Sequence, residues 1–120
     1  MGKKRKKKGK NGASSKANGS EATMALRALT AGEVKEQVGQ VAPWAYDSDD
    51  GGRIVRDVEL SSFSKALEFI NSVGEIAEEM DHHPEIYNVY NKVSFALMTH
   101  SVDGISRLDF ELARRIEEIL

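Results

Sequence analysis

The longest regular pattern in the sequence is an amphipathic helix that runs from about Phe63 to Met80. Its apolar side chains recur at spacings of three and four residues, at Phe63, Ala66, Leu67, Ile70, Val73, Ala77 and Met80. Ser61 or Ser62 precedes the pattern as an N-cap. Pro84 disfavours a helical conformation at the residue before it, so the helix has to end near Asp81. The rest of the chain must therefore provide a cover for one face of this helix.

A hairpin is predicted before the helix. Residues 44–46 form a short extended piece, residues 47–52 are dense in Asp, Ser and Gly, and residues 53–60 form the second arm. Ile54, Val58 and Leu60 share one face of that arm because strand side chains alternate with a period of two.

A second hairpin is predicted after the helix. Residues 85–87 form the short arm, residues 88–91 lie near the turn, and residues 92–99 form the long arm. Val93, Phe95 and Leu97 share one face of the long arm, so that face is expected to be buried.

Two further helices are predicted at the ends of this pattern. Thr30 and Glu33 are spaced as a capping box, and so are Ser106 and Asp109. The inward residues are expected to be Ala31, Val34, Val38 and Val41 in the first helix, and Leu108, Leu112, Ile116 and Ile119 or Leu120 in the last. The order α-β-β-α-β-β-α predicts an α+β fold with two layers, in which helices cover one face of an antiparallel four-stranded sheet.

Charge divides the chain into two parts. Residues 1–20 carry eight of the 17 basic side chains and none of the 19 acidic ones, so the remainder has nine basic against 19 acidic groups. Residues 1–23 offer almost nothing to bury and are expected to be a disordered basic tail, with a domain at 24–120. The run from Lys3 to Lys8 is typical of a nuclear localisation signal or of weak attraction to nucleic acid, but it is also typical of a solubilising extension.

Composition narrows the classes of protein. The chain has no cysteine, which excludes disulfides, thiolate nucleophiles and cysteine-based metal sites. No apolar run approaches the roughly 18 residues that span a bilayer, and no apolar segment follows the basic start as in a secretory signal. We expect a cytoplasmic protein without membrane contact, with a nuclear fraction if the basic run acts as a localisation signal.

All three histidines lie in two short segments. Glu78, Asp81, His82 and His83 are near the end of the central helix, and His100 follows the long arm of the second hairpin. Histidine both donates and accepts protons near neutral pH, so an acid–base site is indicated. Metal binding is a weaker alternative, because Glu78 and His82 are four residues apart but match no established metal motif. A solvated helix end is the third interpretation.

The spacing of these residues resembles the signature of the pterin-4a-carbinolamine dehydratases. The matching positions are Glu78, His82, His83, Pro84, Tyr90, His100 and Asp109, together with the literal runs Asp-His-His-Pro-Glu at 81–85 and Asn-Val-Tyr-Asn-Lys-Val at 88–93. The resemblance extends weakly back to Thr30 and covers about three quarters of the chain. It implies the same element order, a homodimer or homotetramer, and a hydro-lyase that needs no metal or cofactor.

The resemblance also implies a reaction and its residues. The family converts 4a-hydroxytetrahydrobiopterin to quinonoid dihydrobiopterin and water, in the recycling of tetrahydrobiopterin for the aromatic amino-acid hydroxylases. By resemblance, the catalytic residues are His82, His83, His100 and Glu78, with His82 and His100 as the acid–base pair and His83 positioning the pterin. The implied substrate-binding residues are Asp81, His82, His83, Pro84, Met98, Thr99, His100 and Ser101.

Two points qualify the resemblance. Ile86 stands where many family members have an aromatic residue, so ring stacking at that position is absent or is provided by Tyr87. Strand parity also places His100 on the face opposite Val93, Phe95 and Leu97, so the site should open on the uncovered face or at the sheet end.

Some animal members of the family also serve as a dimerisation cofactor of a transcription factor, and this non-catalytic role is the alternative function.

Overall fold

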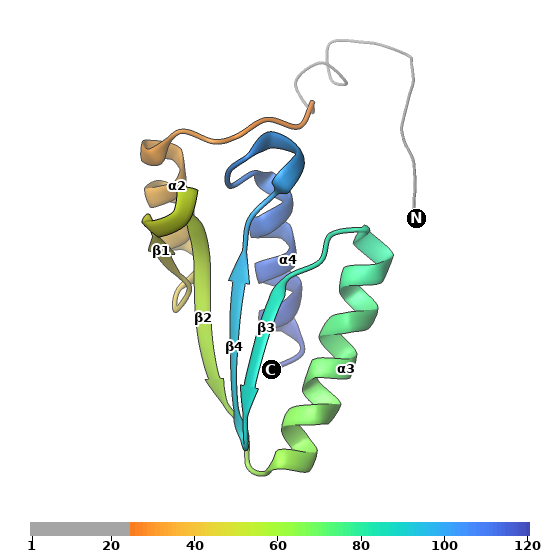
Figure 1. Cartoon of the computed structure of the whole chain (residues 1–120). Helices are drawn as coiled ribbons and strands as arrows, with labels where there is room; N and C mark the ends of the chain where they lie inside the picture. Colours follow the sequence, from red (N-terminus) through yellow and green to blue (C-terminus); the bar gives the residue numbers. More distant parts are fainter. Residues whose placement is uncertain (1–24) are drawn as a thin grey trace.

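The computed structural model describes residues 25–120, so the predicted disorder of residues 1–23 and the basic run within them lie outside the described residues. Figure 1 shows the chain. The elements are α2 (Ala31–Val38), η1 (Gly39–Val41), β1 (Ala45–Asp47), η2 (Asp49–Gly51), β2 (Arg53–Glu59), α3 (Phe63–Met80), β3 (Glu85–Val89), β4 (Lys92–Leu97), η3 (His100–Val102) and α4 (Arg107–Glu118), where η marks a short 3₁₀ turn. This is the predicted α-β-β-α-β-β-α order.

The strands form one antiparallel four-stranded sheet in the order β1-β2-β4-β3. On the covered face, Ile54 and Val58 of β2 lie beside Val93, Phe95 and Leu97 of β4, and all five are buried. The other face, which we call the open face, carries alternate residues such as Val55, Asp57, Tyr87, Ser94 and Ala96. The predicted α+β two-layer fold is thus confirmed.

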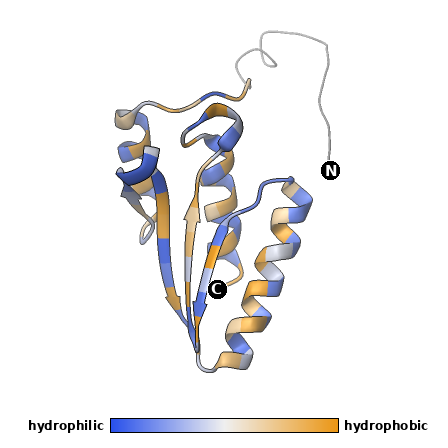
Figure 2. Ribbon diagram, in the orientation of Figure 1, coloured by the Kyte–Doolittle hydropathy of each residue, from blue (hydrophilic) through white to orange (hydrophobic). Residues whose placement is uncertain are grey.

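Helix α3 packs on the covered face through a narrower stripe than expected. Its buried residues are Ala66, Phe69, Val73 and Ala77, whereas Phe63 and Leu67 are 45% and 42% exposed. The prediction was wrong for Phe63 and Leu67, and it did not include Phe69. The residues that face the sheet are those at 66, 69, 73 and 77, whereas Phe63 and Leu67 lie on the side of the helix. Figure 2 shows apolar and polar positions alternating along this helix.

The core gathers around Phe95 in the central strand β4. Its ring lies 5.7 Å from the Phe69 ring and 6.4 Å from the Trp44 ring, measured between centroids. The carboxylate of Glu117 in α4 accepts hydrogen bonds from Trp44 Nε1 at 2.8 Å and from Arg56 Nε at 2.7 Å. Arg56 is on the covered face of β2, so this carboxylate fastens the last helix to the sheet.

Several element boundaries differ from those expected. Strand β3 continues to Val89, strand β4 ends at Leu97 rather than at Thr99, and α4 ends at Glu118. Ile119 and Leu120 are 42% and 49% exposed, so their predicted inward position was wrong. The final apolar residues lie past the last helical turn, where the period of 3.6 no longer directs them to the core.

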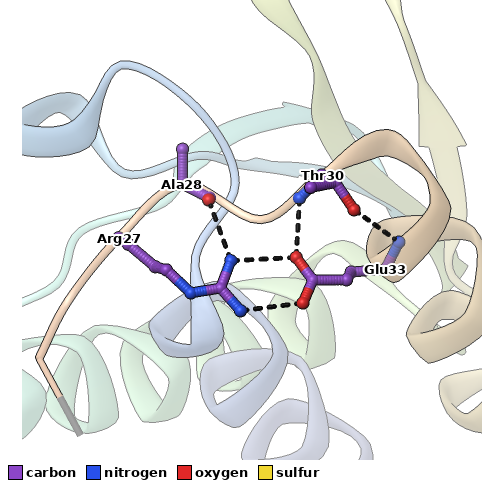
Figure 3. A network of polar contacts seen from close by, with 4 residues as sticks. All are labelled: Arg27, Ala28, Thr30 and Glu33. Atoms are coloured by element: carbon purple, nitrogen blue, oxygen red, sulfur yellow. Dashed lines mark hydrogen bonds and ion pairs between the residues drawn. The ribbon is translucent and has the colours of Figure 1, made fainter. Parts of the chain in front are cut away.

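The capping box of α2 is present as predicted, and it is reinforced from upstream. Thr30 Oγ1 accepts from the Glu33 backbone N–H at 3.1 Å, while Glu33 Oε1 accepts from the Thr30 N–H at 2.8 Å. The guanidinium of Arg27 also donates two hydrogen bonds to the Glu33 carboxylate, from Nη1 to Oε1 at 2.9 Å and from Nη2 to Oε2 at 2.7 Å (Figure 3). The Arg27 hydrogen bonds, with the backbone of Thr30, lower the pKa of Glu33 to about 2. The stability this contact gives is therefore present above about pH 4.3 and is lost as the pH falls toward 2.

Among the described residues, no helix is long and apolar enough to cross a lipid bilayer.

Candidate active site

The end of α3 sends its two following histidines in different directions. Asp81 has a left-handed backbone conformation, with φ of 51° and ψ of 44°. The Asp81 N–H donates to the Glu78 carbonyl at 3.2 Å, and the His82 N–H donates to the Ala77 carbonyl at 3.0 Å. This pair of bonds is a Schellman motif, which closes the helix and turns the chain sharply. Asp81, predicted to bind substrate, is exposed and has this backbone role in the structure.

His82 is buried and paired with a buried aspartate. The Nε2 atom of His82 lies 2.6 Å from Oδ1 of Asp109, and the two side chains are 9% and 0% exposed. Asp109 is in the first turn of α4, so this contact links the end of α3 to the start of α4. A buried pair at such a distance needs further hydrogen bonds to offset the loss of hydration.

The second oxygen of Asp109 receives those further hydrogen bonds. Oδ2 accepts from Thr99 Oγ1 at 2.8 Å and from the Ser106 backbone N–H at 2.9 Å. The Thr99 and Ser106 hydroxyls are themselves 2.7 Å apart, and both residues are buried. We assign the hydrogen of His82 to Nε2, because a carboxylate whose other oxygen is already occupied accepts from the ring.

This assignment determines which atom of His82 is available for chemistry. Nδ1 of His82 has no hydrogen-bond partner within residues 25–120. An imidazole held by Nε2 in this way presents Nδ1 as its proton-accepting atom, and protonation there is stabilised by the carboxylate behind it.

His83 forms a second histidine–carboxylate pair that faces solvent. Its Nε2 lies 2.6 Å from Oε2 of Glu78, and the side chains are 56% and 78% exposed. His83 and Glu78 line an open groove of about 930 Å³ between α3 and the start of β3, together with Pro84 and Ile86. The structure therefore brings together three of the predicted site residues, Glu78, His83 and Pro84.

His100 lies at the same end of the sheet. The start of β2, the end of β4, the start of β3 and the end of α3 are all at the upper end in Figure 1. Because β4 ends at Leu97, His100 begins the η3 turn and is exposed, so strand parity does not determine its direction. Its neighbour Thr99 contacts Asp109, which ties this segment to His82. Met98 is half-buried and Ser101 is exposed.

Asp109 and Ser106 were not among the predicted site residues. Their spacing predicted a structural role for both residues, as the two partners of a capping box, and the structure confirms that box. The capping bond uses only one carboxylate oxygen, which leaves the other for His82. The spacing that resembles the dehydratase signature ends on Asp109, and this was the sequence signal that could have identified it as a site residue. Within residues 25–120 no group of three or more His, Asp or Glu side chains is arranged to hold a metal ion.

The fold and site together define a small α+β protein with paired imidazoles and carboxylates at one end of its sheet. Residues 27–119 match the family model described as pterin 4 alpha carbinolamine dehydratase, and the chain belongs to that family.

Similar proteins cover nearly the whole domain. A protein of Novosphingobium aromaticivorans, provisionally named a pterin-4-alpha-carbinolamine dehydratase, is 41% identical over 97 residues, which are 81% of this chain and 100% of the relative. A protein of Sulfolobus acidocaldarius with the same provisional name is 35% identical over 91 residues, 76% of this chain and 97% of the relative.

Two solved structures share the fold. The transcriptional coactivator/pterin dehydratase of Brucella melitensis superposes with a TM-score of 0.73 at 34% identity, covering 78% of this chain and 98% of that one. A pterin dehydratase-like protein described as a RuBisCO assembly factor in the alpha-carboxysome superposes with a TM-score of 0.55 at 16% identity, covering 62% and 86%. The second likeness concerns the fold alone.

Proposed function

We propose that this protein is a 4a-hydroxytetrahydropterin dehydratase, acting on 4a-hydroxytetrahydrobiopterin in tetrahydrobiopterin recycling. The observation that carries the proposal is the buried His82–Asp109 pair at 2.6 Å, within the span that matches the dehydratase family. A non-catalytic adaptor has no physical need for an imidazole held by a buried carboxylate, because such a pair costs hydration energy.

The reaction is a loss of water that needs two proton transfers. An acid must protonate the hydroxyl that leaves C4a, and a base must take the proton from N5 as the C=N bond forms. Nδ1 of His82 supplies one of these functions, with Asp109 stabilising the imidazolium behind it. His100, exposed at the start of η3, supplies the other. No metal or cofactor takes part in this scheme, so activity should survive treatment with a chelator.

The remaining predicted residues form the pterin site. His83 holds the pterin from the groove side, with Glu78 orienting its ring through Nε2. Pro84 lines the same groove. We assign Met98, Thr99 and Ser101 to a second wall of the pterin site, because they are adjacent to His100 in the chain. Thr99 acts through Asp109 in this scheme, because its hydroxyl is already hydrogen-bonded there.

The direct test is an assay with 4a-hydroxytetrahydropterin generated in situ, in which formation of the quinonoid dihydropterin is followed with and without the protein. The proposal expects the protein to accelerate the spontaneous dehydration. An unchanged rate, with folded protein confirmed by circular dichroism, would remove the enzymatic function and favour the alternative.

The alternative is a coactivator-like binding role on the same fold, as the name of the Brucella melitensis neighbour suggests for that protein. The exposed apolar residues Phe63 and Leu67 on α3 favour a protein contact at that helix. We further propose a homodimer or homotetramer, because β3 is an edge strand whose Tyr87 and Val89 are 69% and 52% exposed. Light scattering after size exclusion tests the assembly.

A further inference from the structure

Two buried hydroxyl groups lie behind the carboxylate of Asp109. Thr99 and Ser106 are 3% and 0% exposed, and Asp109 is 0% exposed. Thr99 Oγ1 lies 2.8 Å from Oδ2 of Asp109 and 2.7 Å from Oγ of Ser106. A hydroxyl has one hydrogen to donate, and an ionised carboxylate only accepts. Thr99 therefore donates to Asp109, and the Ser106 hydroxyl donates to Thr99.

This series of hydrogen bonds, which we call the hydroxyl chain, begins at the backbone of α4. Ser106 Oγ accepts from the Leu108 N–H at 3.2 Å. The donors therefore all point the same way, from the backbone to the carboxylate, in the order Leu108, Ser106, Thr99 and Asp109. Hydrogen bonds that follow one another in one direction polarise and strengthen each other in a buried site. The hydroxyl chain thus occupies Oδ2 of Asp109 and leaves Oδ1 to His82.

The helix cap of α4 does not by itself explain the hydroxyl chain. The cap needs the Ser106 oxygen as an acceptor and a carboxylate oxygen for the Ser106 N–H, and both bonds are present. Neither of these bonds uses a hydroxyl hydrogen, and neither involves Thr99. Thr30, the corresponding residue of the α2 capping box, is exposed to solvent and needs no such partner. The two buried hydroxyl hydrogens therefore serve the Asp109 carboxylate rather than the cap.

The backbone of Thr99 is also held in place. Its N–H donates to the Gly104 carbonyl at 2.7 Å, and the Gly104 N–H donates back to the Thr99 carbonyl at 3.3 Å. These two bonds close the turn that begins at His100, so the Thr99 hydroxyl has a fixed origin from which it reaches Asp109. A donor that is fixed in advance holds its acceptor without reorganisation during a reaction.

We propose that Thr99 and Ser106 are positioning residues, which hold the Asp109 carboxylate in the orientation that keeps the hydrogen of His82 on Nε2 and leaves Nδ1 for the substrate. This rests on the proposed dehydratase function. Neither hydroxyl is left to contact the pterin, so both act on proton transfer through Asp109.

The test removes one hydroxyl at a time from the full chain and measures dehydration kinetics. Thr99→Val has nearly the same shape without the hydroxyl, and it should lower kcat about 10-fold with little change in KM, the worth of one hydrogen bond to a charged group. Thr99→Ser keeps a hydroxyl and should retain most of the activity. Ser106→Ala should lower kcat less than Thr99→Val, because Thr99 still donates to Asp109. The double variant should lose no more kcat than Thr99→Val alone, because the Ser106 hydroxyl acts only through Thr99.

Proton NMR reports on His82 independently of the reaction. The hydrogen on Nε2, buried against Asp109 at 2.6 Å, should give a downfield resonance that exchanges slowly with water in the wild type. Exchange should be about 10-fold faster in Thr99→Val and close to the wild-type rate in Thr99→Ser. Unchanged kcat and unchanged exchange in Thr99→Val would overturn the inference alone. A wild-type protein that dehydrates no pterin would overturn the proposed function, and the exchange rates would still decide whether the hydroxyl chain holds His82.

Ser62→Ala is the matched control for Ser106→Ala. Ser62 is the N-cap of α3, where its hydroxyl oxygen accepts from the Lys65 N–H at 3.1 Å, at the end of that helix away from the histidines. Both variants lose a helix cap, so both should have a lower melting temperature than the wild type. Only Ser106→Ala should also lower kcat and speed the exchange of the Nε2 hydrogen. Equal kcat and equal exchange in the two variants would mean that Ser106 acts only as a cap, and this comparison decides the inference even if Thr99→Val fails to fold.

Discussion

Two histidine–carboxylate pairs follow one another at the end of α3, and their Nε2–oxygen distances are the same, 2.6 Å. The side chains of His82 and Asp109 are 9% and 0% exposed, whereas those of His83 and Glu78 are 56% and 78% exposed. Equal geometry does not mean equal energy, because water screens the outer pair and is excluded from the inner one. We therefore expect the inner pair to dominate stability and, under the proposed function, proton transfer, and we expect the outer pair to contribute to ligand contact.

The inner pair is also part of a network, which the outer pair is not. Asp109 accepts from Thr99 and Ser106 in addition to His82, so removing its charge affects three donors at once. Within residues 25–120, His83 contacts one carboxylate, that of Glu78, and water can replace either partner of this exposed pair. Variants of the two pairs should therefore change different measured quantities, and the effects should also differ in size.

The largest effect is expected for Asp109→Asn. An amide of the same shape cannot stabilise an imidazolium on His82 and favours the other ring tautomer, so kcat should fall by about 10³-fold or more. Asp109→Ala should in addition lower the free energy of unfolding by about 3 kcal/mol, since buried donors lose their acceptor. Steady-state kinetics and thermal denaturation measure the two effects.

Glu117→Gln is the matched control for Asp109→Asn. Glu117 is also a carboxylate of α4 that accepts side-chain hydrogen bonds, from Trp44 and Arg56, but it is at the opposite end of the helix from the histidines. The Glu117→Gln variant should have a lower melting temperature than the wild type, with little change in kcat. Comparable losses of kcat in both variants would mean that Asp109 acts only through stability.

The next effect concerns the acid–base pair. His82→Ala and His100→Ala should each lower kcat by about 10²-fold or more, the usual worth of a positioned acid or base. If all three histidine variants lost kcat equally, the assignment of separate roles would be wrong.

The outer pair should give smaller changes of another type. His83→Ala should raise KM several-fold with a modest change in kcat, and Glu78→Gln should have a still weaker effect on KM. Neither should change the free energy of unfolding by more than about 0.5 kcal/mol, as is usual for exposed pairs. A large drop in melting temperature for Glu78→Gln would show that the exposed pair is more than a surface contact.

The sequence predicted the element order, the two capping boxes and the buried face of β4, because each rests on local periodicity or on bonds within one turn. It did not predict that Phe69 faces the core or that Asp109 faces His82, since both depend on how α3 and α4 approach other elements. The sequence indicated which residue types could do acid–base chemistry. It did not indicate which of the two histidine–carboxylate pairs is buried.

The smallest effect is expected from removing the basic segment, so that the chain begins at Met24. Residues 1–23 lie outside the family match at 27–119, so melting temperature and kcat should be unchanged at 0.15 M salt.

At low ionic strength, truncation should distinguish the two pairs once more. Glu75, Glu78 and Glu79 line the groove beside His83, and the eight basic side chains of residues 1–20 attract such carboxylates when the screening length exceeds about 10 Å. Truncation should then change KM slightly at 10 mM salt and leave kcat, which depends on the buried pair, untouched. Adhesion to polyanions such as nucleic acid, and any nuclear import, should be lost with the segment. A truncated chain that loses activity or assembly at 0.15 M salt would place the domain boundary before residue 24.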